Sequence, residues 1–214
     1  MPAADLAARA GALIQPGRRV LLGITGSPGA GKTTLAKHLV DTLNEVSGVH
    51  TAVHLPMDGF HLANSTLDTL GIHHRKGAID TFDGWGFVAL LRRLLVEVDH
   101  PVYAPSFERT IDEPVAGEIA IPAHIPLIVV EGNYLLVDQQ PWNEIRPLLA
   151  ESWFCETPES ERLVRLVDRH TRHGRSPAVA AAWARTVDGA NAALIERTRS
   201  RADAVISGVD SVRI

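Results

Sequence analysis

The stretch Gly26-Ser27-Pro28-Gly29-Ala30-Gly31-Lys32-Thr33 decides the fold of this 214-residue chain, because it matches the pattern G-x-x-x-x-G-K-[ST] in full. Glycines let a backbone wrap closely around an anion, and the amides of such a loop point at phosphate oxygens. Lys32 is expected to reach the β- and γ-phosphates, and the Thr33 hydroxyl to ligate Mg²⁺. The predicted ATP-binding residues are Gly26, Ser27, Pro28, Gly29, Ala30, Gly31, Lys32, Thr33 and Thr34.

The flanks of this loop have the expected form. Residues 18–25 (RRVLLGIT) are an apolar run that is typical of a buried parallel strand. Residues 32–46 have helical spacing, with Leu35, Leu39, Leu43 and Val46 on one face. A glycine-rich turn with a stray lysine is the alternative, and a strand before the loop and a helix after it argue against that alternative.

Strands and helices alternate along the rest of the chain. Thr157 is expected to cap a helix that has Pro158 at its first position. The other strands are predicted at residues 51–58, 126–132, 152–157 and 202–206, and helices at 84–98, 158–173 and 177–200. This pattern predicts an α/β fold with one doubly wound, mostly parallel five-stranded sheet in a single domain. Two excursions interrupt it, a polar segment at residues 59–83 and a short excursion or hairpin at 102–122.

Composition limits the partners. The formal net charge of −4 argues against polymeric nucleic acid, whose partners usually carry a basic face. Apolar runs are too short to span a bilayer, and the N-terminus lacks the basic start and apolar block of a signal peptide. Cys155 is the only cysteine and is predicted to be a small core residue. We therefore expect a protein of the reducing cytoplasm, without a membrane partner.

Two carboxylates follow predicted strands. Sites in parallel sheets lie at the carboxyl ends of the strands, so Asp58 and Glu131 are expected to face the glycine-rich loop. A carboxylate at the position of Glu131 can hold Mg²⁺, directly or through water, and one at Asp58 can accept the proton of an attacking hydroxyl. The alternatives are a surface glutamate after a core strand and an aspartate that merely caps a turn.

An arginine-rich helix follows later in the chain. Arg162, Arg165, Arg169 and Arg172 recur at helical spacing, and Arg175 lies just beyond them. Like charges at this spacing repel, so a compensating phosphate anion is expected near the cluster, with Arg165 and Arg169 favoured; a solvated basic face is the alternative for any single arginine.

Other polar residues leave their roles open. Arg75 and Lys76 are expected either to hold an anionic acceptor or to solvate a loop. Adjacent His73 and His74 suit one zinc ion poorly, and Asp188 and Asn191, one turn apart on a helix, could reach substrate or cap a neighbouring element.

These segments together resemble a known group of enzymes. The loop, Asp58-Gly59-Phe60-His61, Arg75-Lys76-Gly77 with Thr81-Phe82-Asp83, Val102-Tyr103 and Val130-Glu131-Gly132 come in the order of the uridine kinase, bacterial pantothenate kinase and phosphoribulokinase superfamily. The resemblance covers residues 18–206 and is strongest to the short bacterial nucleoside/nucleotide-kinase-like, or fructokinase-like, branch. It implies a kinase that transfers the γ-phosphate of ATP to a hydroxyl of a nucleoside, sugar or pantothenate-like small molecule.

The resemblance also implies roles for single residues. Asp58 is the general base, Lys32 and Arg169 act on the phosphates, and Glu131 assists Mg²⁺. Phe60, His61 and Tyr103 line the acceptor site, with Arg75, Lys76, Glu108 and Arg109 as further candidates. Glu108 stands where the uridine kinases have a histidine, so the Glu108–Arg109 pair is expected to bind a polyol or an acid, or to be a solvent-exposed ion pair.

The family carries an arginine-rich helical lid, which corresponds here to residues 159–200, although Arg169-His170 replaces the usual Arg-Asp. Relatives often form dimers or tetramers, which is compatible with a homodimer. The competing hypothesis is a nucleotide-gated regulatory or assembly protein with slow hydrolysis, which would need no acceptor base.

Overall fold

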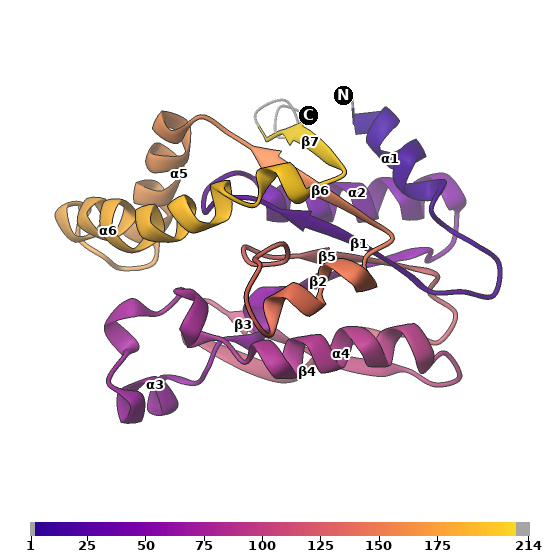
Figure 1. Cartoon of the computed structure of the whole chain (residues 1–214), viewed down its shortest axis with the longest axis horizontal. Coiled ribbons are helices and arrows are strands. Elements are labelled where there is room, and N and C mark those ends of the chain that lie inside the picture. Colours follow the sequence, from indigo (N-terminus) through magenta and orange to yellow (C-terminus); the bar gives the residue numbers. More distant parts are fainter. Residues whose placement is uncertain (1–2, 209–214) are drawn as a thin grey trace.

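A fully parallel five-stranded sheet forms the centre of the computed structural model, which describes residues 3–208. The strand order is β2-β5-β1-β6-β7. The strands are β1 (Val20–Thr25), β2 (Ala52–Pro56), β5 (Leu127–Glu131), β6 (Glu151–Glu156) and β7 (Ala204–Ser207). Central β1 pairs with β5 and β6, with Leu22 opposite Val129 and Glu151. This topology confirms the predicted doubly wound, mostly parallel sheet (Figure 1).

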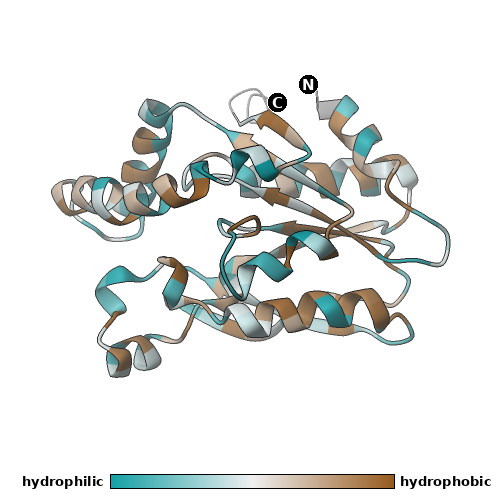
Figure 2. Cartoon of the chain, in the orientation of Figure 1, coloured by the Kyte–Doolittle hydropathy of each residue, from teal (hydrophilic) through white to brown (hydrophobic). Residues whose placement is uncertain are grey.

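Helices cover both faces of the sheet because its strands are apolar on both sides. On one face, Leu22 and Ile24 of β1 pack in a cluster with α1 (Ala3–Gly11) and α2 (Lys32–Ser47). On the other face, Leu21 and Ile128 pack in a cluster with α4 (Gly84–Val96). Figure 2 shows apolar residues concentrated on the strands and on α4.

The two excursions have structure of their own. Residues 59–83 contain α3 (Asn64–Leu70) and 3₁₀ turns at His73–Arg75 and Ile79–Thr81. Residues 102–122 form the expected hairpin of β3 (Val102–Glu108) and β4 (Glu113–Ile121). Gly59 brings the hairpin close, since a Cβ there would lie 2.2 Å from the Pro105 carbonyl oxygen.

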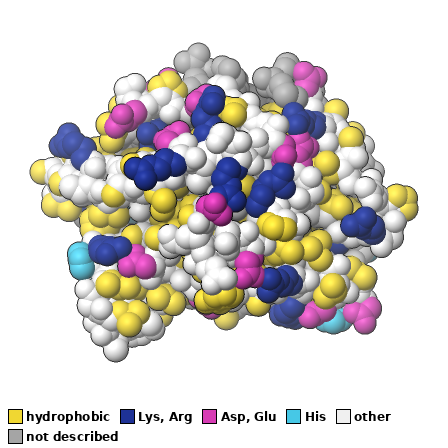
Figure 3. All heavy atoms as spheres, in the orientation of Figure 1, with side chains coloured by type: hydrophobic (Ala, Val, Ile, Leu, Met, Phe, Trp, Pro, Cys, Tyr) yellow, Lys and Arg dark blue, Asp and Glu magenta, His cyan; other side chains and the backbone are white. Residues whose placement is uncertain are grey.

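Helices α5 (Glu159–Arg172) and α6 (Pro177–Glu196) pack against each other at one end of the molecule (Figure 1). No helix within residues 3–208 has the length and the hydropathy that crossing a membrane requires. On the face drawn in Figure 3, basic and acidic side chains are interspersed and form no continuous basic surface.

Some local expectations were wrong. Thr157 does not cap α5; its hydroxyl donates to the Ala30 carbonyl (2.9 Å), and Pro158 occupies the N-cap position. Val46, predicted to share a face with Leu43, is 83% exposed and lies outside the core. Strand β2 ends at Pro56, and Asp58 lies in the 3₁₀ turn that follows.

Candidate active site

The glycine-rich loop, residues 26–33, connects β1 to α2 at the carboxyl edge of the sheet. Gly26 has φ 145°, and a Cβ there would lie 2.3 Å from the Cys155 carbonyl oxygen, so only glycine fits. Lys32 is 6% exposed, and its ammonium donates to the Ser27 carbonyl (3.2 Å). Burial lowers the pKa of Lys32, against the opposing effect of Glu131. A buried ammonium of this kind is stabilised by a phosphate anion.

Side chains packed beneath the loop donate hydrogen bonds to its carbonyl groups. The Ala30 carbonyl accepts from the Cys155 thiol (3.1 Å) and from Thr157. Burial raises the pKa of Cys155 to about 11, so the thiol keeps its proton and acts as a buried donor. Arg162 and Arg165 of α5 donate to the Pro28 and Gly29 carbonyls, both at 3.4 Å. These carbonyls are thus satisfied by the protein, and of the loop amides that of Ala30 donates to the Ser27 carbonyl (3.1 Å), which leaves others for an anion.

A pair of oxygen ligands lies at the end of the loop. The Thr33 hydroxyl donates to the Glu131 carboxylate (3.1 Å), and His54 Nε2 lies 3.7 Å from the same Oε2 atom. A hydroxyl beside a carboxylate, next to a phosphate-binding loop, matches the hard oxygen ligands that Mg²⁺ prefers. The residues present therefore fit the predicted magnesium position.

Asp58 faces the same space from the 3₁₀ turn Met57–Phe60. Its carboxylate accepts from the Arg109 guanidinium at 3.1 Å. Burial raises the pKa of Asp58, but the positive charges of His61, Arg109, Arg169 and Lys32 outweigh it, and the net shift is downward. Asp58 is therefore ionised at neutral pH, as an acceptor of a hydroxyl proton must be.

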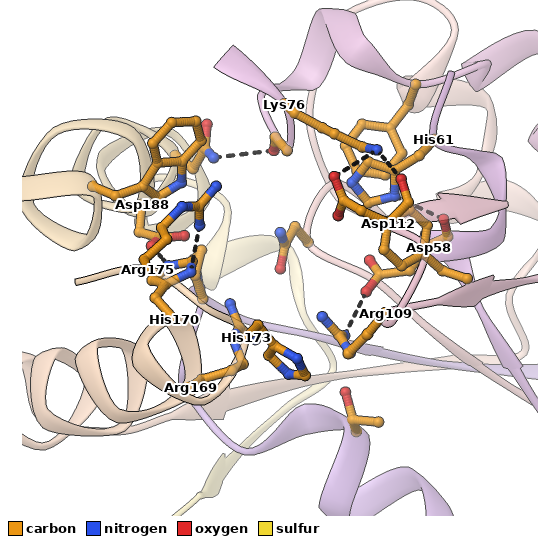
Figure 4. A pocket seen from close by; sticks show the side chains of 18 of the residues that line it. Asp58, His61, Lys76, Arg109, Asp112, Arg169, His170, His173, Arg175 and Asp188 are labelled. Carbon is orange, nitrogen blue, oxygen red and sulfur yellow. Dashed lines mark hydrogen bonds and ion pairs between the residues drawn. The ribbon is translucent and has the colours of Figure 1, made fainter. Parts of the chain in front are cut away.

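One cavity of about 560 Å³ brings nine of the predicted residues together (Figure 4). The predicted residues that line it are Pro28, Lys32, Thr33, Asp58, His61, Lys76, Arg109, Glu131 and Arg169. Asp58 and Arg109 lie on one wall in Figure 4, and Arg169 and His170 lie on the facing helix. Phosphate-binding groups and a carboxylate therefore share one space.

Two residues of the hairpin lie elsewhere. Tyr103 is 60% exposed, because Val102 and Ala104 on either side of it point inward and strand side chains alternate. Glu108 is half-buried, and its carboxylate accepts from the backbone and hydroxyl of Thr110 (2.8 Å each). Neither side chain lines the cavity, so the structure supplies no contact for their predicted roles.

Other predicted residues also lie outside the cavity lining: Phe60, Arg75 and Arg165, and the loop residues Gly26, Ser27, Gly29, Ala30, Gly31 and Thr34. Phe60 packs on Phe87 in the core, with ring centroids 5.0 Å apart. Arg75 forms an exposed ion pair with Asp80 (2.7 Å). Arg165 holds the Gly29 carbonyl from outside, as described above. Of the Arg75–Lys76 pair, only Lys76 reaches the cavity.

The arginines of α5 separate into different environments. Arg169 faces the cavity, and within residues 3–208 its guanidinium has no hydrogen-bond acceptor or ion-pair partner. Burial, and the nearby charge of Arg109, lower the pKa of Arg169. Arg172 points outward and pairs with Asp168. Of the four arginines at helical spacing, Arg169 alone has its donors directed at the cavity.

The opposite wall holds a cluster that the sequence did not assign. His170 Nε2 lies 2.7 Å from Asp188 Oδ2, and His170 Nδ1 lies 2.7 Å from Arg175 Nη1. Arg175 stacks on Trp183, with its guanidinium carbon 4.1 Å from the ring centroid. Asn191 donates to the Gly77 carbonyl (3.0 Å) and joins α6 to the first excursion. The sequence signals for this wall were the spacing of Asp188 and Asn191, the position of Arg175 just beyond the arginine-rich helix, and His170 in place of the usual aspartate.

The chain is similar to known proteins that are named as kinases. A model of the Phosphoribulokinase / Uridine kinase family matches residues 21–214. A Schizosaccharomyces pombe protein, named provisionally as a uridine kinase, is 34% identical over 174 residues, which are 79% of this chain and 74% of that protein. An ATP-dependent kinase-like protein of Aspergillus versicolor is 37% identical over 161 residues, 71% of this chain and 94% of its own.

A solved structure has the same arrangement. The crystal structure of a Silicibacter protein, described provisionally as a fructose transport system kinase, has a TM-score of 0.87 at 36% identity. The match covers 96% of this chain and 99% of the Silicibacter chain. The similarity therefore spans the glycine-rich loop, both excursions and helices α5 and α6.

Proposed function

This chain belongs to the phosphoribulokinase/uridine kinase family, and from that premise we propose that it transfers the γ-phosphate of ATP to a hydroxyl of a small molecule. One observation carries the proposal: an ionised carboxylate, Asp58, lines the same cavity as Lys32 of the glycine-rich loop. A nucleotide switch needs no second carboxylate besides the one at the magnesium position, whereas a kinase needs one within reach of the attacking hydroxyl.

Each residue has a role in this proposal. The loop amides and Lys32 hold the phosphates, and Asp58 orients the acceptor hydroxyl and accepts its proton as the oxygen attacks phosphorus. Arg169, with its free donors, neutralises charge on the transferring group. Thr33 and Glu131 hold Mg²⁺, which when bound neutralises phosphate charge. Closure of the α5–α6 lid, residues 159–200, excludes water.

The acceptor binds between the hairpin and the first excursion, where His61, Lys76 and Arg109 line the cavity. Aromatic rings in the cavity lining support this placement. The His61 ring packs between the rings of Phe82 and Phe107, at centroid distances of 4.0 Å and 4.6 Å. A nucleoside, a sugar and a pantothenate-like acid all carry the required hydroxyl, and we propose this class of acceptor.

The test is ATP-dependent phosphorylation of a panel of small hydroxyl compounds with Mg²⁺, measured by mass spectrometry and ADP release. We expect one compound class to gain phosphate in step with ADP. Asp58→Asn should lower kcat about 10²- to 10⁴-fold and leave ATP affinity unchanged, whereas Asp168→Asn, on the exposed face of α5, should retain full activity. ADP release without a phosphorylated product, equal in both variants, would instead establish the nucleotide-switch alternative.

A further inference from the structure

The cavity wall formed by α5 and α6 presents a cationic donor that no carboxylate of the protein neutralises directly. Within residues 3–208, three cavity acids are each bonded to a neighbouring side chain: Asp58 to Arg109, Asp112 to Lys76, and Asp188 to His170. The Lys76 ammonium also donates to Asn64 and is fully engaged. Arg175, in contrast, has no carboxylate within ion-pair distance among these residues.

The surroundings of Arg175 fix its guanidinium in place. One N–H group donates to His170 Nδ1 (2.7 Å), and the guanidinium plane lies over the Trp183 ring. A guanidinium can only donate, so His170 Nδ1 accepts from Arg175, and the other ring nitrogen, Nε2, donates to Asp188. A guanidinium has five N–H donors, so most of those of Arg175 stay free at the cavity wall.

The position of Arg175 differs from that of the arginines next to the glycine-rich loop. Arg162 and Arg165, earlier on α5, contact loop carbonyls. The His170–Arg175 pair instead lies beside Asp188, one turn from Asn191, which bonds to Gly77 of the first excursion. Figure 4 shows Arg175, His170 and Asp188 on the wall facing Lys76, Asp112 and Asp58. Arg175 therefore borders the acceptor half of the cavity.

We propose that Arg175 binds an anionic group of the acceptor, a carboxylate or a phosphate, at a distance from the hydroxyl that receives the phosphoryl group. A guanidinium fork held in one orientation matches both kinds of oxyanion. The acceptor class is then a hydroxylated small molecule with a negatively charged end, rather than a neutral sugar or nucleoside. The inference rests on the proposed kinase function of the same cavity.

Binding of simple anions tests the site without a known acceptor. The protein is saturated with Mg²⁺ and a non-hydrolysable ATP analogue, which fills all three phosphate positions, and is titrated with inorganic phosphate or acetate. Tryptophan fluorescence reports binding because Trp183 stacks on Arg175. We expect saturable binding whose Kd rises about 10- to 100-fold in Arg175→Gln and is unchanged in Arg172→Gln, whose side chain points outward.

Saturation by phosphate alone identifies a phosphomonoester acceptor, and saturation by acetate a carboxylate. The proposal is overturned if neither anion saturates the wild-type protein, or if Arg175→Gln binds as tightly as wild type. Turnover assays separate this outcome from failure of the kinase function. They compare the phosphorylation of a hydroxy acid with that of its amide, and of a sugar phosphate with that of its free sugar. Equal use of neutral and anionic members contradicts the anion site alone. Anion binding without phosphorylation of any compound contradicts the kinase function alone.

Discussion

At the scale of a single residue, two opposing effects act on the pKa of Asp58. Its carboxylate is half-buried, and the partial loss of hydration raises its pKa, while the charges of His61, Arg109, Arg169 and Lys32 lower the pKa further than burial raises it. Of these groups, Arg109 is in direct contact, at 3.1 Å. The hairpin that carries Arg109 thus helps to keep the proposed base, which belongs to another element, in its charged form.

Arg109→Gln tests this control. Loss of the guanidinium removes an attraction for the charged carboxylate, so the pKa of Asp58 rises. A protonated Asp58 cannot accept the hydroxyl proton, and the acid limb of the kcat/KM profile should therefore move to higher pH. Arg109→Lys keeps the charge and should leave the limb nearer its wild-type position. An acid limb that does not move in Arg109→Gln would show that another group sets it.

Residues whose position depends on local sequence were predictable, and those whose position depends on distant pairing were not. Lys32 and Thr33 follow a loop whose shape is encoded within eight residues, and both line the cavity. Tyr103 and Glu108 sit on a strand whose pairing with β4 shifts register between Ala104 and Ser106. Which side chains of that strand face the cavity depends on the partner strand, and no local pattern encodes it.

At the scale of elements, Arg19 at the start of β1 holds the end of α4 and the approach to β5. Its guanidinium donates to the Leu94 and Glu97 carbonyls and to those of Pro122, Ala123 and Ile125, at 2.9–3.1 Å. The residue is 4% exposed. Arg19 thus satisfies carbonyl groups that the helix end leaves without an intrahelical partner.

Arg19→Met should lower the free energy of unfolding by about 3 kcal/mol or more, because buried carbonyls lose their donors at about 1–3 kcal/mol each. Urea unfolding measured by circular dichroism checks this value. Arg18→Met is the matched control, since Arg18 is exposed and makes a single bond to Gln15 at 3.4 Å. Equal stability of the two variants would mean that water replaces the guanidinium at these carbonyls.

The type of an element, helix or strand, was predictable wherever the pattern of apolar residues extended over most of the element, as in β1, α2 and β5. Element ends were less so, and Thr157 shows why. Its place before Pro158 satisfies a local capping rule, yet its hydroxyl bonds to the Ala30 carbonyl of the glycine-rich loop. That carbonyl lies 127 positions earlier in the chain, so a tertiary contact replaced the local one.

At the scale of the whole molecule, the cavity lies between the carboxyl edge of the sheet and the helix pair α5 and α6. The glycine-rich loop, Glu131 and Asp58 belong to the sheet and its edge, while Arg169 and His170 belong to α5. Few polar bonds connect α6 to the body, among them Glu196 with Ser27 (2.5 Å) and Asn191 with Gly77 (3.0 Å). A phosphate bound between the two parts would add contacts to both, so the position of α5 and α6 is expected to depend on nucleotide.

Hydrogen exchange tests this dependence. Free donors of Arg169 face the cavity, so a bound triphosphate should attract the guanidinium and hold α5 against the loop. Addition of a non-hydrolysable ATP analogue with Mg²⁺ should slow amide exchange in α5 and α6 as well as in residues 26–33.

Arg169→Gln should bind the analogue about tenfold more weakly. At saturation, this variant should retain the protection of the loop and lose most of the protection of α5. Arg172→Gln, whose arginine faces solvent, should behave as wild type. Protection of α5 that persists in Arg169→Gln would place the nucleotide-dependent contact elsewhere, with Arg162 and Arg165 as the remaining arginines of that helix that touch the loop.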